Sequence, residues 1–377
     1  MAKQRNSRAD NTRVQETIRL IKSLPTIRRT RVKSPTRTLN PKEYERLLTI
    51  IQDGKSFPDK LRFEYTRSTN QFEIRTTTQL HEGLVGVFLE NFVLWRAGLG
   101  KLDNPRISHA AETLRLHGNA HIEFSVPEGP MDMKSPDGGI RHICELECPD
   151  PALVFEVGFT NTREELNKKA RDYILRSEGK IRTVIVVYVG DIYAAERKNE
   201  RRLRKGCRSG EIDESGLASY PKDAKNITAG ASILVWRARI QRNNTLTVGR
   251  VQEKKFRDTT GSPIRLASLH ITLEDCVCDS IVDLAKESEI PSLEIPSESF
   301  CNAIDLDLIA YRKRRAKVVK EAMEKEKKEK EEREKHKEEG RQRRATEIGT
   351  LEDVGVLGRV IVEHGTSFSA RIRGKKS

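Results

Sequence analysis

Two apolar stretches separated by an amphipathic segment constrain the fold of this chain more than any other feature. The first, ALVFEVGF at 152–159, surrounds the single carboxylate of Glu156 and has the length of a buried strand. The second, IRTVIVVYV at 181–189, is typical of a strand in the middle of a covered sheet. Between them, TREELNKKARDYILRSEG has apolar residues at helical spacing, and Gly179 favours a helix end. The order strand, helix, strand predicts an α/β core.

Segments on both sides of this unit extend the core. Asn40 followed by Pro41 is a helix start signal, and QLHEGLVGVFLENFVLWRAGL at 79–99 has the spacing of a long core helix. Alternating apolar residues predict a β-hairpin at 60–78. We therefore expect a mixed central sheet flanked by helices. The other predicted strands are 119–126, 232–240, 245–251 and 267–273.

The net charge of +14 is concentrated in the flanks of the chain. Residues 1–37 contain eleven Lys or Arg and two acidic residues, and residues 311–344 contain sixteen and nine. The body between them, 38–310, has three more acidic than basic residues. A basic total favours a polyanionic partner, and here the flanks would supply the attraction.

Composition divides the chain into parts. Residues 1–39 are basic and polar, which predicts a disordered arm. Residues 40–290 are predicted to form one domain with a polar, basic insertion at about 191–229. The remaining parts are a linker at 291–309, a charged helix at 310–345 and a flexible tail at 346–377.

The charged helix is rich in Glu and Lys, which are good helix formers, and pairs such as Glu321 and Lys325 lie four residues apart. Apolar residues stop at Met323, so the segment lacks the heptad seam of a coiled coil. We expect a single solvated helix, with a helix that binds a protein partner as the alternative. Its basic clusters at 312–315 and 341–344 are weak indications of nuclear import.

The sequence contains no segment suited to a membrane or to secretion. No run of about 18 apolar residues exists, and the N-terminal residues lack the apolar core of a signal peptide. We expect an intracellular, reducing compartment, the nucleus in a eukaryote and the cytoplasm otherwise. Cys144 and Cys148 near His142, and the pair Cys276 and Cys278, lack the two-residue gap of zinc knuckles. We therefore expect thiols there.

One set of polar residues in the core carries a resemblance. The combination Pro136-Asp137, Glu156 in its strand and Lys169 in the next helix resembles the PD-(D/E)XK, or restriction-endonuclease-like, nuclease superfamily. It is most similar to the putative restriction endonucleases of bacterial genomes, in which a Glu-Val pair ends a strand and the following helix has Leu-x-x-Lys-x-x-x-Tyr. The resemblance covers roughly residues 60–250 and implies a restriction-endonuclease-like core.

The lysine position departs from the superfamily signature. That signature places Lys two residues after the second acid, where this chain has Gly158. In the more similar family the following helix supplies the lysine, and Lys169 matches that location. Lys168 lies about 100° round the helix and should point to solvent. Gly158 would leave space for the backbone and substrate to approach.

The resemblance implies a divalent-metal site. Asp137 and Glu156 would bind Mg²⁺ or Mn²⁺, with the backbone carbonyl of Val157 as a further ligand. Lys169 would orient the attacking water or stabilise the charge that develops on the phosphate. Glu82, in the leading helix, would hold a second metal ion or orient a metal-bound water.

Each of these residues also has a plainer explanation. Glu156 would be satisfied by an ion pair with Lys169 or an arginine, because a buried carboxylate needs a partner. Asp137 precedes two glycines, which is a good turn sequence. Glu82 would then be an exposed helix residue, and His81 a half-buried histidine.

The insertion contains ERKNERRLRKGCR, with seven Lys or Arg between 197 and 208. Beside the sheet edge this segment would bind the phosphates of nucleic acid, and a disordered, solvated loop is the alternative. The candidate phosphate contacts are Arg197, Arg201, Arg202, Arg204 and Arg208.

We therefore expect a metal-dependent nuclease, with duplex DNA as the preferred substrate. The rival hypothesis is a catalytically inactive, nuclease-like protein that binds nucleic acid or serves as a scaffold. The near-neutral body and the glycine at 158 favour the rival, and the trio Asp137, Glu156 and Lys169 favours the enzyme.

Overall fold

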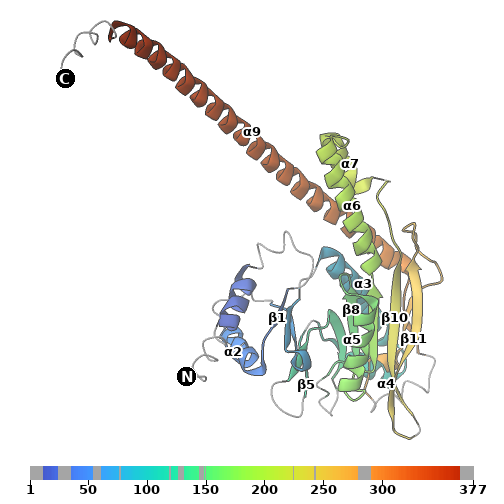
Figure 1. Ribbon diagram of the computed structural model, residues 1–377. Helices are drawn as coiled ribbons and strands as arrows, with labels where there is room; N and C mark the ends of the chain where they lie inside the picture. The colour runs from blue at the N-terminus through green and yellow to red at the C-terminus, as the bar shows by residue number, and fades with distance from the viewer. Residues whose placement is uncertain are drawn as a thin grey trace, which may run out of the picture.

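The computed structural model describes eleven segments of the chain. They form a mixed α/β structure with two main sheets, a two-stranded sheet and a long C-terminal helix (Figure 1). Side chains are described up to residue 344. The described segments are 12–23, 35–53, 61–75, 78–118, 120–125, 131–143, 148, 150–223, 225–241, 243–278 and 290–365.

The larger sheet has six strands in the order β11-β10-β9-β8-β7-β4. Strand β8 runs parallel to β9, and the other neighbouring pairs are antiparallel. The prediction of a mixed central sheet is therefore confirmed. Its strands are β4 (Leu114–Leu116), β7 (Gly138–His142), β8 (Leu153–Gly158), β9 (Thr183–Tyr188), β10 (Ala231–Ile240) and β11 (Leu246–Arg257).

Helices cover both faces of this sheet. Side chains alternate between the two faces along each strand, so one strand contributes apolar residues to both cores. Phe155 and Val157 of β8 belong to the core that includes α3 (Gln79–Leu99). Val154 belongs to the opposite core, under α5 (Arg163–Arg176). Glu156 shares the face of Val154, so the alternation directs its carboxylate towards α5.

The smaller main sheet forms an N-terminal lobe together with α2 (Pro41–Gln52). Asn40 caps α2 through a capping box and Pro41 starts it, as the sequence predicts. The predicted hairpin is present, with Phe63 opposite Ile74. The sheet order is β1 (Thr36–Thr38), β3 (Gln71–Ile74), β2 (Phe63–Thr66), β6 (Asp132–Lys134) and β5 (Ile122–Phe124), and the turn η1 (Arg67–Thr69) joins β2 to β3.

The prediction of a disordered arm is wrong for residues 12–23, which form a helix, and for 35–39, which contain β1 and the buried Leu39. Val14, Ile18 and Ile21 of this helix are buried in the core of the N-terminal lobe with Tyr44. Their three- and four-residue spacing is that of a helix. The many basic residues around them led to the prediction of disorder. Residues 1–11 and 24–34 of the predicted arm lie outside the described segments.

The predicted insertion is also ordered. It contains α6 (Gly190–Ser209), α7 (Glu214–Ser219) and the turn η2 (Tyr220–Lys222). One face of α6 is buried although it includes Glu196, Asn199 and Glu200. Because polar residues interrupt its apolar stripe, the sequence pattern suggested a loop.

The predicted linker at 291–309 is wrong as well. Strand β13 (Leu293–Ile295) pairs with β12 (Leu269–Ile271), and α9 (Ser297–Gly365) begins 13 residues before the predicted charged helix. Phe300 and Ile304 of α9 are fully buried in the core with α3. The remaining elements are α4 (Pro105–Thr113) and the turn η3 (Leu273–Asp275).

Two buried ion pairs fix α9 to α6. Arg312 Nε lies 2.9 Å from Glu196 Oε2, and Arg315 Nε lies 2.9 Å from Glu200 Oε2. All four side chains are buried. The basic cluster at 312–315 therefore has two of its four cations occupied inside the fold, which argues against its use as an import signal.

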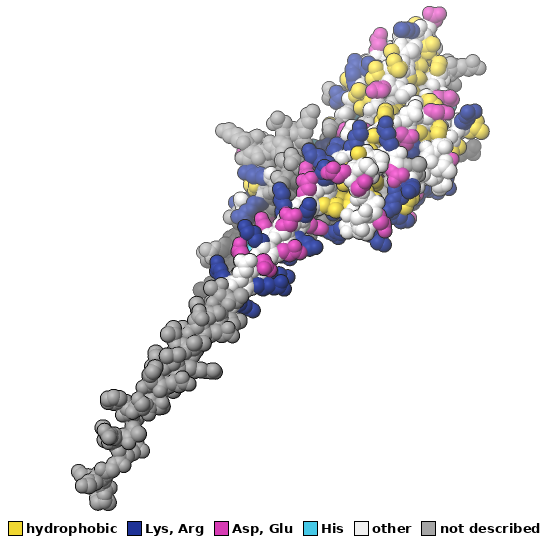
Figure 2. All heavy atoms as spheres, turned by 90° about the horizontal axis from the view of Figure 1, so that it is seen from above, with side chains coloured by type: hydrophobic (Ala, Val, Ile, Leu, Met, Phe, Trp, Pro, Cys, Tyr) yellow, Lys and Arg dark blue, Asp and Glu magenta, His cyan; other side chains and the backbone are white. Residues whose placement is uncertain are grey.

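Beyond these contacts α9 leaves the body as a single helix, as the sequence predicts (Figure 1). The helix has 69 residues and a length of about 100 Å. Lys, Arg, Asp and Glu side chains alternate along its described part (Figure 2), and contacts such as Lys325 Nζ to Glu329 Oε1 at 3.7 Å join neighbouring turns. Helix continues to Gly365 in the predicted flexible tail, and 366–377 lie outside the described segments.

Candidate active site

The two predicted acids lie at adjacent strand positions in the larger sheet. Asp137 immediately precedes β7, and its backbone N–H donates to Phe155 O of β8 at 3.2 Å. The Val157 N–H donates to Asp137 Oδ2 at 2.8 Å. The carboxylates of Asp137 and Glu156 are both buried, at 5% and 2% exposure. The chain enters β7 from β6 of the other sheet, so Asp137 lies where the two sheets meet.

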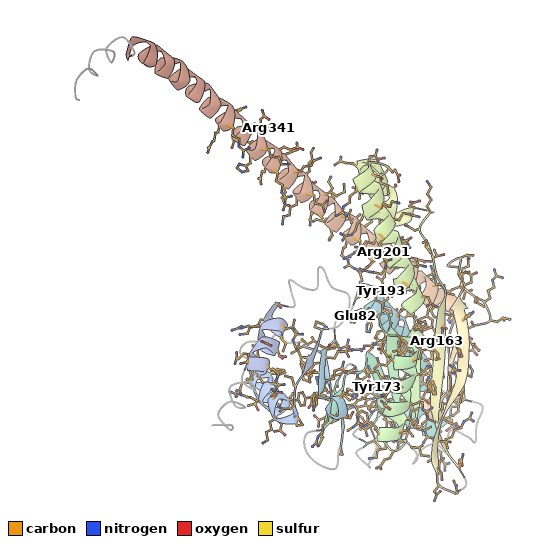
Figure 3. All side chains as sticks on the ribbon, in the orientation of Figure 1. Glu82, Arg163, Tyr173, Tyr193, Arg201 and Arg341 are labelled. Atoms are coloured by element: carbon orange, nitrogen blue, oxygen red, sulfur yellow. The ribbon has the colours of Figure 1, made fainter. Side chains whose placement is uncertain are left out.

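Lys169 reaches the same place from α5. Its Nζ lies 2.8 Å from Glu156 Oε1, while Lys168 is exposed, as the helical geometry predicts. Tyr173, one turn further along α5, donates its hydroxyl hydrogen to Glu156 Oε1 at 2.8 Å (Figure 3 labels Tyr173). The three side chains predicted to meet therefore lie together in one buried cluster.

Gly158 has a different role from the one its position suggested. A Cβ atom at residue 158 would lie 2.1 Å from Leu166 Cδ1, so any side chain would collide with α5. The glycine leaves room for Leu166 and not for substrate. A lysine at 158 would require Leu166 to move, whereas Lys169 of α5 already lies beside Glu156.

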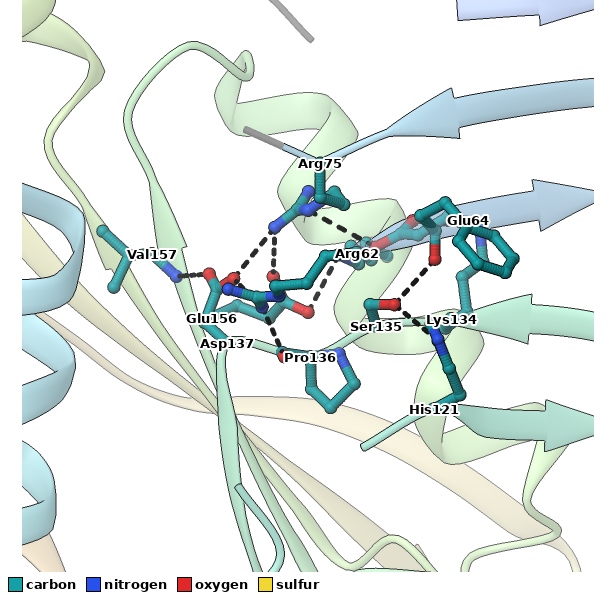
Figure 4. A network of polar contacts seen from close by, with 12 residues as sticks. Arg62, Glu64, Arg75, His121, Lys134, Ser135, Pro136, Asp137, Glu156 and Val157 are labelled. Atoms are coloured by element: carbon teal, nitrogen blue, oxygen red, sulfur yellow. Dashed lines mark hydrogen bonds and ion pairs between the residues drawn. The ribbon is translucent and has the colours of Figure 1, made fainter. Parts of the chain in front are cut away.

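Two arginines from the N-terminal lobe complete the cluster (Figure 4). Arg75 Nη2 lies 3.1 Å from Asp137 Oδ1 and 3.4 Å from Glu156 Oε2, so one nitrogen bridges both acids. Arg62 Nη2 donates to Asp137 Oδ1 at 3.0 Å and to Pro136 O at 2.7 Å. The plainer explanation, an ion pair between Glu156 and a lysine or arginine, therefore describes the contacts that are present.

A third carboxylate comes from β2. Glu64 is 6% exposed, and its Oε1 lies 2.7 Å from Lys169 Nζ. Lys134 of β6 approaches Glu64 Oε2 at 3.6 Å. Lys169 thus bridges Glu64 of the smaller main sheet and Glu156 of the larger sheet, and so joins the N-terminal lobe to the larger sheet.

His81 and Glu82 lie in the first turn of α3. His81 Nε2 is 2.7 Å from Asp137 Oδ2, and the imidazole is 6% exposed. Glu82 has a 57% exposed side chain and lies 3.8 Å from both Arg62 Nη1 and His81 Nδ1. These two neighbours connect Glu82 to Asp137. The exposure of Glu82 fits the expected helix surface residue better than a metal ligand.

Burial and charge shift the proton affinities in this cluster. Burial alone would raise the pKa of Asp137, but the His81 and Arg75 cations outweigh it and hold that pKa well below its usual range. Burial raises the pKa of the Glu156 carboxyl despite the nearby Lys169. Glu156 and Glu64 raise the pKa of Lys169 against the effect of burial and of Arg75. Lys169 is therefore a fixed cation at neutral pH.

The donor atoms are of the kind that a divalent cation prefers. Mg²⁺ is commonly bound through one or two carboxylates, with water and substrate phosphate as the other ligands. The carboxylates of Asp137 and Glu156 already converge on one cationic nitrogen, that of Arg75. In a strand the N–H and C=O of one residue point to the same side, so the Val157 carbonyl lies on the Asp137 side of β8. Across the described segments, no group of three or more His, Cys, Asp or Glu side chains is arranged to hold a metal ion.

Sequence reasoning missed the contribution of the hairpin. Arg62 and Glu64 alternate with the apolar Phe63 along β2, and Arg75 follows Ile74 at the end of β3. This alternation indicates that one face of the hairpin is polar. What it does not indicate is that a second sheet buries that face.

Glu64 gives a pH-dependent prediction. Burial would raise its pKa, but Lys169, Arg75 and Lys134 lower it to about 2. A carboxyl with a lowered pKa stabilises the fold above its unfolded value, and this stabilisation is lost as pH falls towards the folded value. We expect Glu64→Gln to cost on the order of 3 kcal/mol at pH 7. The difference from wild type should shrink below about pH 4.5 in denaturant titrations, whereas the exposed Glu45→Gln should change little at any pH.

The five predicted phosphate-binding arginines lie on α6 and divide into two groups. Arg197 and Arg201 are exposed on its outer face, and Figure 3 shows Arg201 near the point where α9 crosses α6. The other three have protein partners. Arg202 donates to Asn226 Oδ1 at 3.0 Å, Arg204 to Glu200 Oε1 at 3.0 Å and Arg208 to Glu326 Oε1 at 2.7 Å.

The cysteines considered in the sequence form no disulfide where they are described. Cys148, Cys276 and Cys278 are free thiols, and Cys144 lies outside the described segments. Cys278 Sγ lies 3.4 Å from His142 Nδ1.

Comparison with known proteins adds no family. The chain matches no protein-family model, no curated protein and no solved structure. Within the described segments, no helix combines the length and apolar character needed to cross a bilayer.

Proposed function

We propose that this protein is a metal-dependent nuclease with a restriction-endonuclease-like core. The observation that carries the proposal is the convergence of Asp137 and Glu156 on a single cationic nitrogen, with Lys169 beside them. Two buried carboxylates aimed at one point are suited to Mg²⁺ or Mn²⁺.

In the proposed site Asp137 and Glu156 hold the metal ion, together with the Val157 carbonyl. When bound, the metal ion supplies Lewis-acid activation of a phosphate and a water. Tyr173 orients the Glu156 carboxylate through its hydrogen bond. Lys169 remains protonated and offers its N–H groups to the oxygen on which negative charge develops.

The charge of the cluster suits a phosphate substrate. Three acids are opposed by four permanent cations, and His81 adds a fifth charge when protonated. A cluster with net positive charge attracts a phosphodiester, and duplex DNA is the proposed substrate. Such a substrate implies the nucleus in a eukaryote or the cytoplasm of a bacterium. The acids are Glu64, Asp137 and Glu156, and the cations are Arg62, Arg75, Lys134 and Lys169.

The exposed arginines of α6 give a test of nucleic-acid binding. Each phosphate contact contributes about 0.9 to the slope of log affinity against log salt concentration. We expect Arg197→Ala with Arg201→Ala to lower the slope for duplex DNA by about 2 and to weaken binding at low salt. The same pair of substitutions at exposed Lys42 and Lys101 is the control. An unchanged slope would remove α6 from the interface.

A catalytically inactive, nucleic-acid-binding protein is the second candidate. Asp137 favours it, because each carboxylate oxygen of that residue already has two partners in the protein. The full chain incubated with supercoiled plasmid and Mg²⁺ or Mn²⁺ separates the two functions. Nicking that EDTA stops supports the nuclease. Binding of the plasmid without nicking in either metal supports the inactive protein.

A further inference from the structure

Arg62 and Arg75 are neighbours across the hairpin. Phe63 pairs with Ile74, and the Arg75 N–H donates to Arg62 O at 2.8 Å, so the two arginines occupy the next paired position. Side chains at paired positions lie on the same face, and like charges there repel. This arrangement therefore depends on an anion that both guanidinium groups can share. In the structure the anion is Asp137, at 3.0 Å from Arg62 and 3.1 Å from Arg75.

A metal ion and the Arg75 guanidinium cannot both bind between the carboxylates of Asp137 and Glu156 at the same time. Arg75 Nη2 lies between the oxygens of Asp137 and Glu156 at 3.1 and 3.4 Å, where a shared cation would lie. The Arg75 side chain is only 10% exposed, and away from these two acids it keeps only the longer contact of its Nε with Glu64 Oε1, at 3.7 Å. Because Glu64 is shared with Lys169 and Lys134, the Arg75 charge needs a further partner once it leaves Asp137 and Glu156.

The substrate offers such a partner. Arginine binds phosphate through two parallel N–H···O bonds, a geometry that ammonium groups do not provide. Arg62 Nε is buried and has no acceptor among the described residues, which leaves a donor unused beside Arg75. A phosphodiester between the two guanidinium groups would satisfy both.

We propose that Arg75 is an internal counter-cation of the metal-free site, and that it transfers to a backbone phosphate of the nucleic acid when a divalent cation takes its place. The inference rests on the proposed function, because it requires the metal site. The metal ion and the phosphate then bind cooperatively, since each relieves the charge imbalance that the other creates. Free metal ions alone bind weakly, because they must displace Arg75 without giving it a new anion.

The test measures Mn²⁺ affinity by calorimetry on the full chain, with and without inorganic phosphate or duplex DNA. For wild type we expect either anion to tighten Mn²⁺ binding by roughly tenfold or more. Arg75→Met should bind Mn²⁺ more tightly than wild type when no anion is present, by a similar factor, and should lose the coupling. Arg67→Met, at the other end of the same hairpin, is the matched control and should behave as wild type. Thermal melting of each variant identifies a loss of fold.

The outcomes separate the inference from the function. If Arg75→Met binds Mn²⁺ no more tightly than wild type, while Glu156→Gln abolishes binding, the metal site stands and the role of Arg75 is refuted. If neither wild type nor Arg75→Met binds Mn²⁺ with any of the anions, the proposed metal-dependent function is itself overturned. Arg75→Lys provides a further check, because a lysine keeps the charge but does not grip phosphate with two parallel bonds.

Discussion

For the proposed nuclease, we expect replacement of Glu156 by Gln to reduce metal-dependent DNA cleavage by roughly 10³-fold, because a metal ligand would supply several kcal/mol of transition-state stabilisation. Asp137→Asn is expected to have a comparable effect. Both substitutions preserve side-chain volume, so the cluster around Arg75 stays packed. Binding of duplex DNA, measured in EDTA, should persist in both variants.

Lys169 offers a sharper comparison because its neighbour is a built-in control. We expect Lys169→Ala to reduce cleavage by about 10²-fold, since one donor to a developing charge is lost. Lys168→Ala removes the same charge one residue away, on the exposed side of α5, and should leave cleavage near wild type. Equal effects of the two substitutions would show that the lysine contributes only general charge. Cleavage by Glu156→Gln at the wild-type rate would place the active site elsewhere.

Truncating Arg312 destabilises the protein by about 3–5 kcal/mol, because Glu196 then remains buried without its cation. Glu196 is 1% exposed and Arg312 is 8% exposed, so water cannot compensate for the loss. The expected measurement is a lower midpoint in urea for Arg312→Ala. Detachment of α9 from α6 would also expose α9 to proteolysis near residue 312.

Controls for this prediction lie on the same helical turn. Lys313→Ala and Arg314→Ala remove exposed charges and should change the unfolding free energy by less than about 0.5 kcal/mol. Replacing both Glu196 and Arg312 by Met should cost much less than Arg312→Ala, because no charge is left unpaired. A double substitution as damaging as the single one would assign the effect to packing and not to charge.

The structure also changes how the basic N-terminal flank can be tested. Deletion of residues 1–37 is the simplest test of whether the basic N-terminal flank attracts nucleic acid. That deletion would remove Val14, Ile18 and Ile21 from the core of the N-terminal lobe, so a loss of binding would have two explanations. Substitution of exposed basic residues avoids this problem, because it leaves the buried face of the helix intact.

Much of the local structure was predictable because it depends on short-range signals. The capped helix after Asn40, the hairpin pairing Phe63 with Ile74, and the strand–helix–strand unit around Glu156 all follow from caps and periodicity. The placement of Lys169 over Glu156 followed from the phase of one helix, since Leu166 and Ala170 had to face the sheet. These features need no knowledge of distant segments.

Errors arose where polar side chains are buried by partners far along the chain. Helix α6 can bury Glu196 and Glu200 because Arg312 and Arg315 form ion pairs with them. These arginines lie more than 100 residues away in the sequence. The same residues look like a solvated loop when read alone. Likewise, the polar face of the hairpin became part of the site only because Asp137 and Glu156 of the other sheet neutralise Arg62 and Arg75.

The sequence by itself determined the strand–helix–strand unit around Glu156, the long helix at 79–99, and two of the three acids and the lysine that meet in the cluster. Only the tertiary structure decided that Arg75 from the N-terminal lobe lies between Asp137 and Glu156, with Arg62 beside it on Asp137. The physical reason is that periodicity reports which face of an element is apolar, whereas the partner of a buried charge is set by chain segments that meet only on folding.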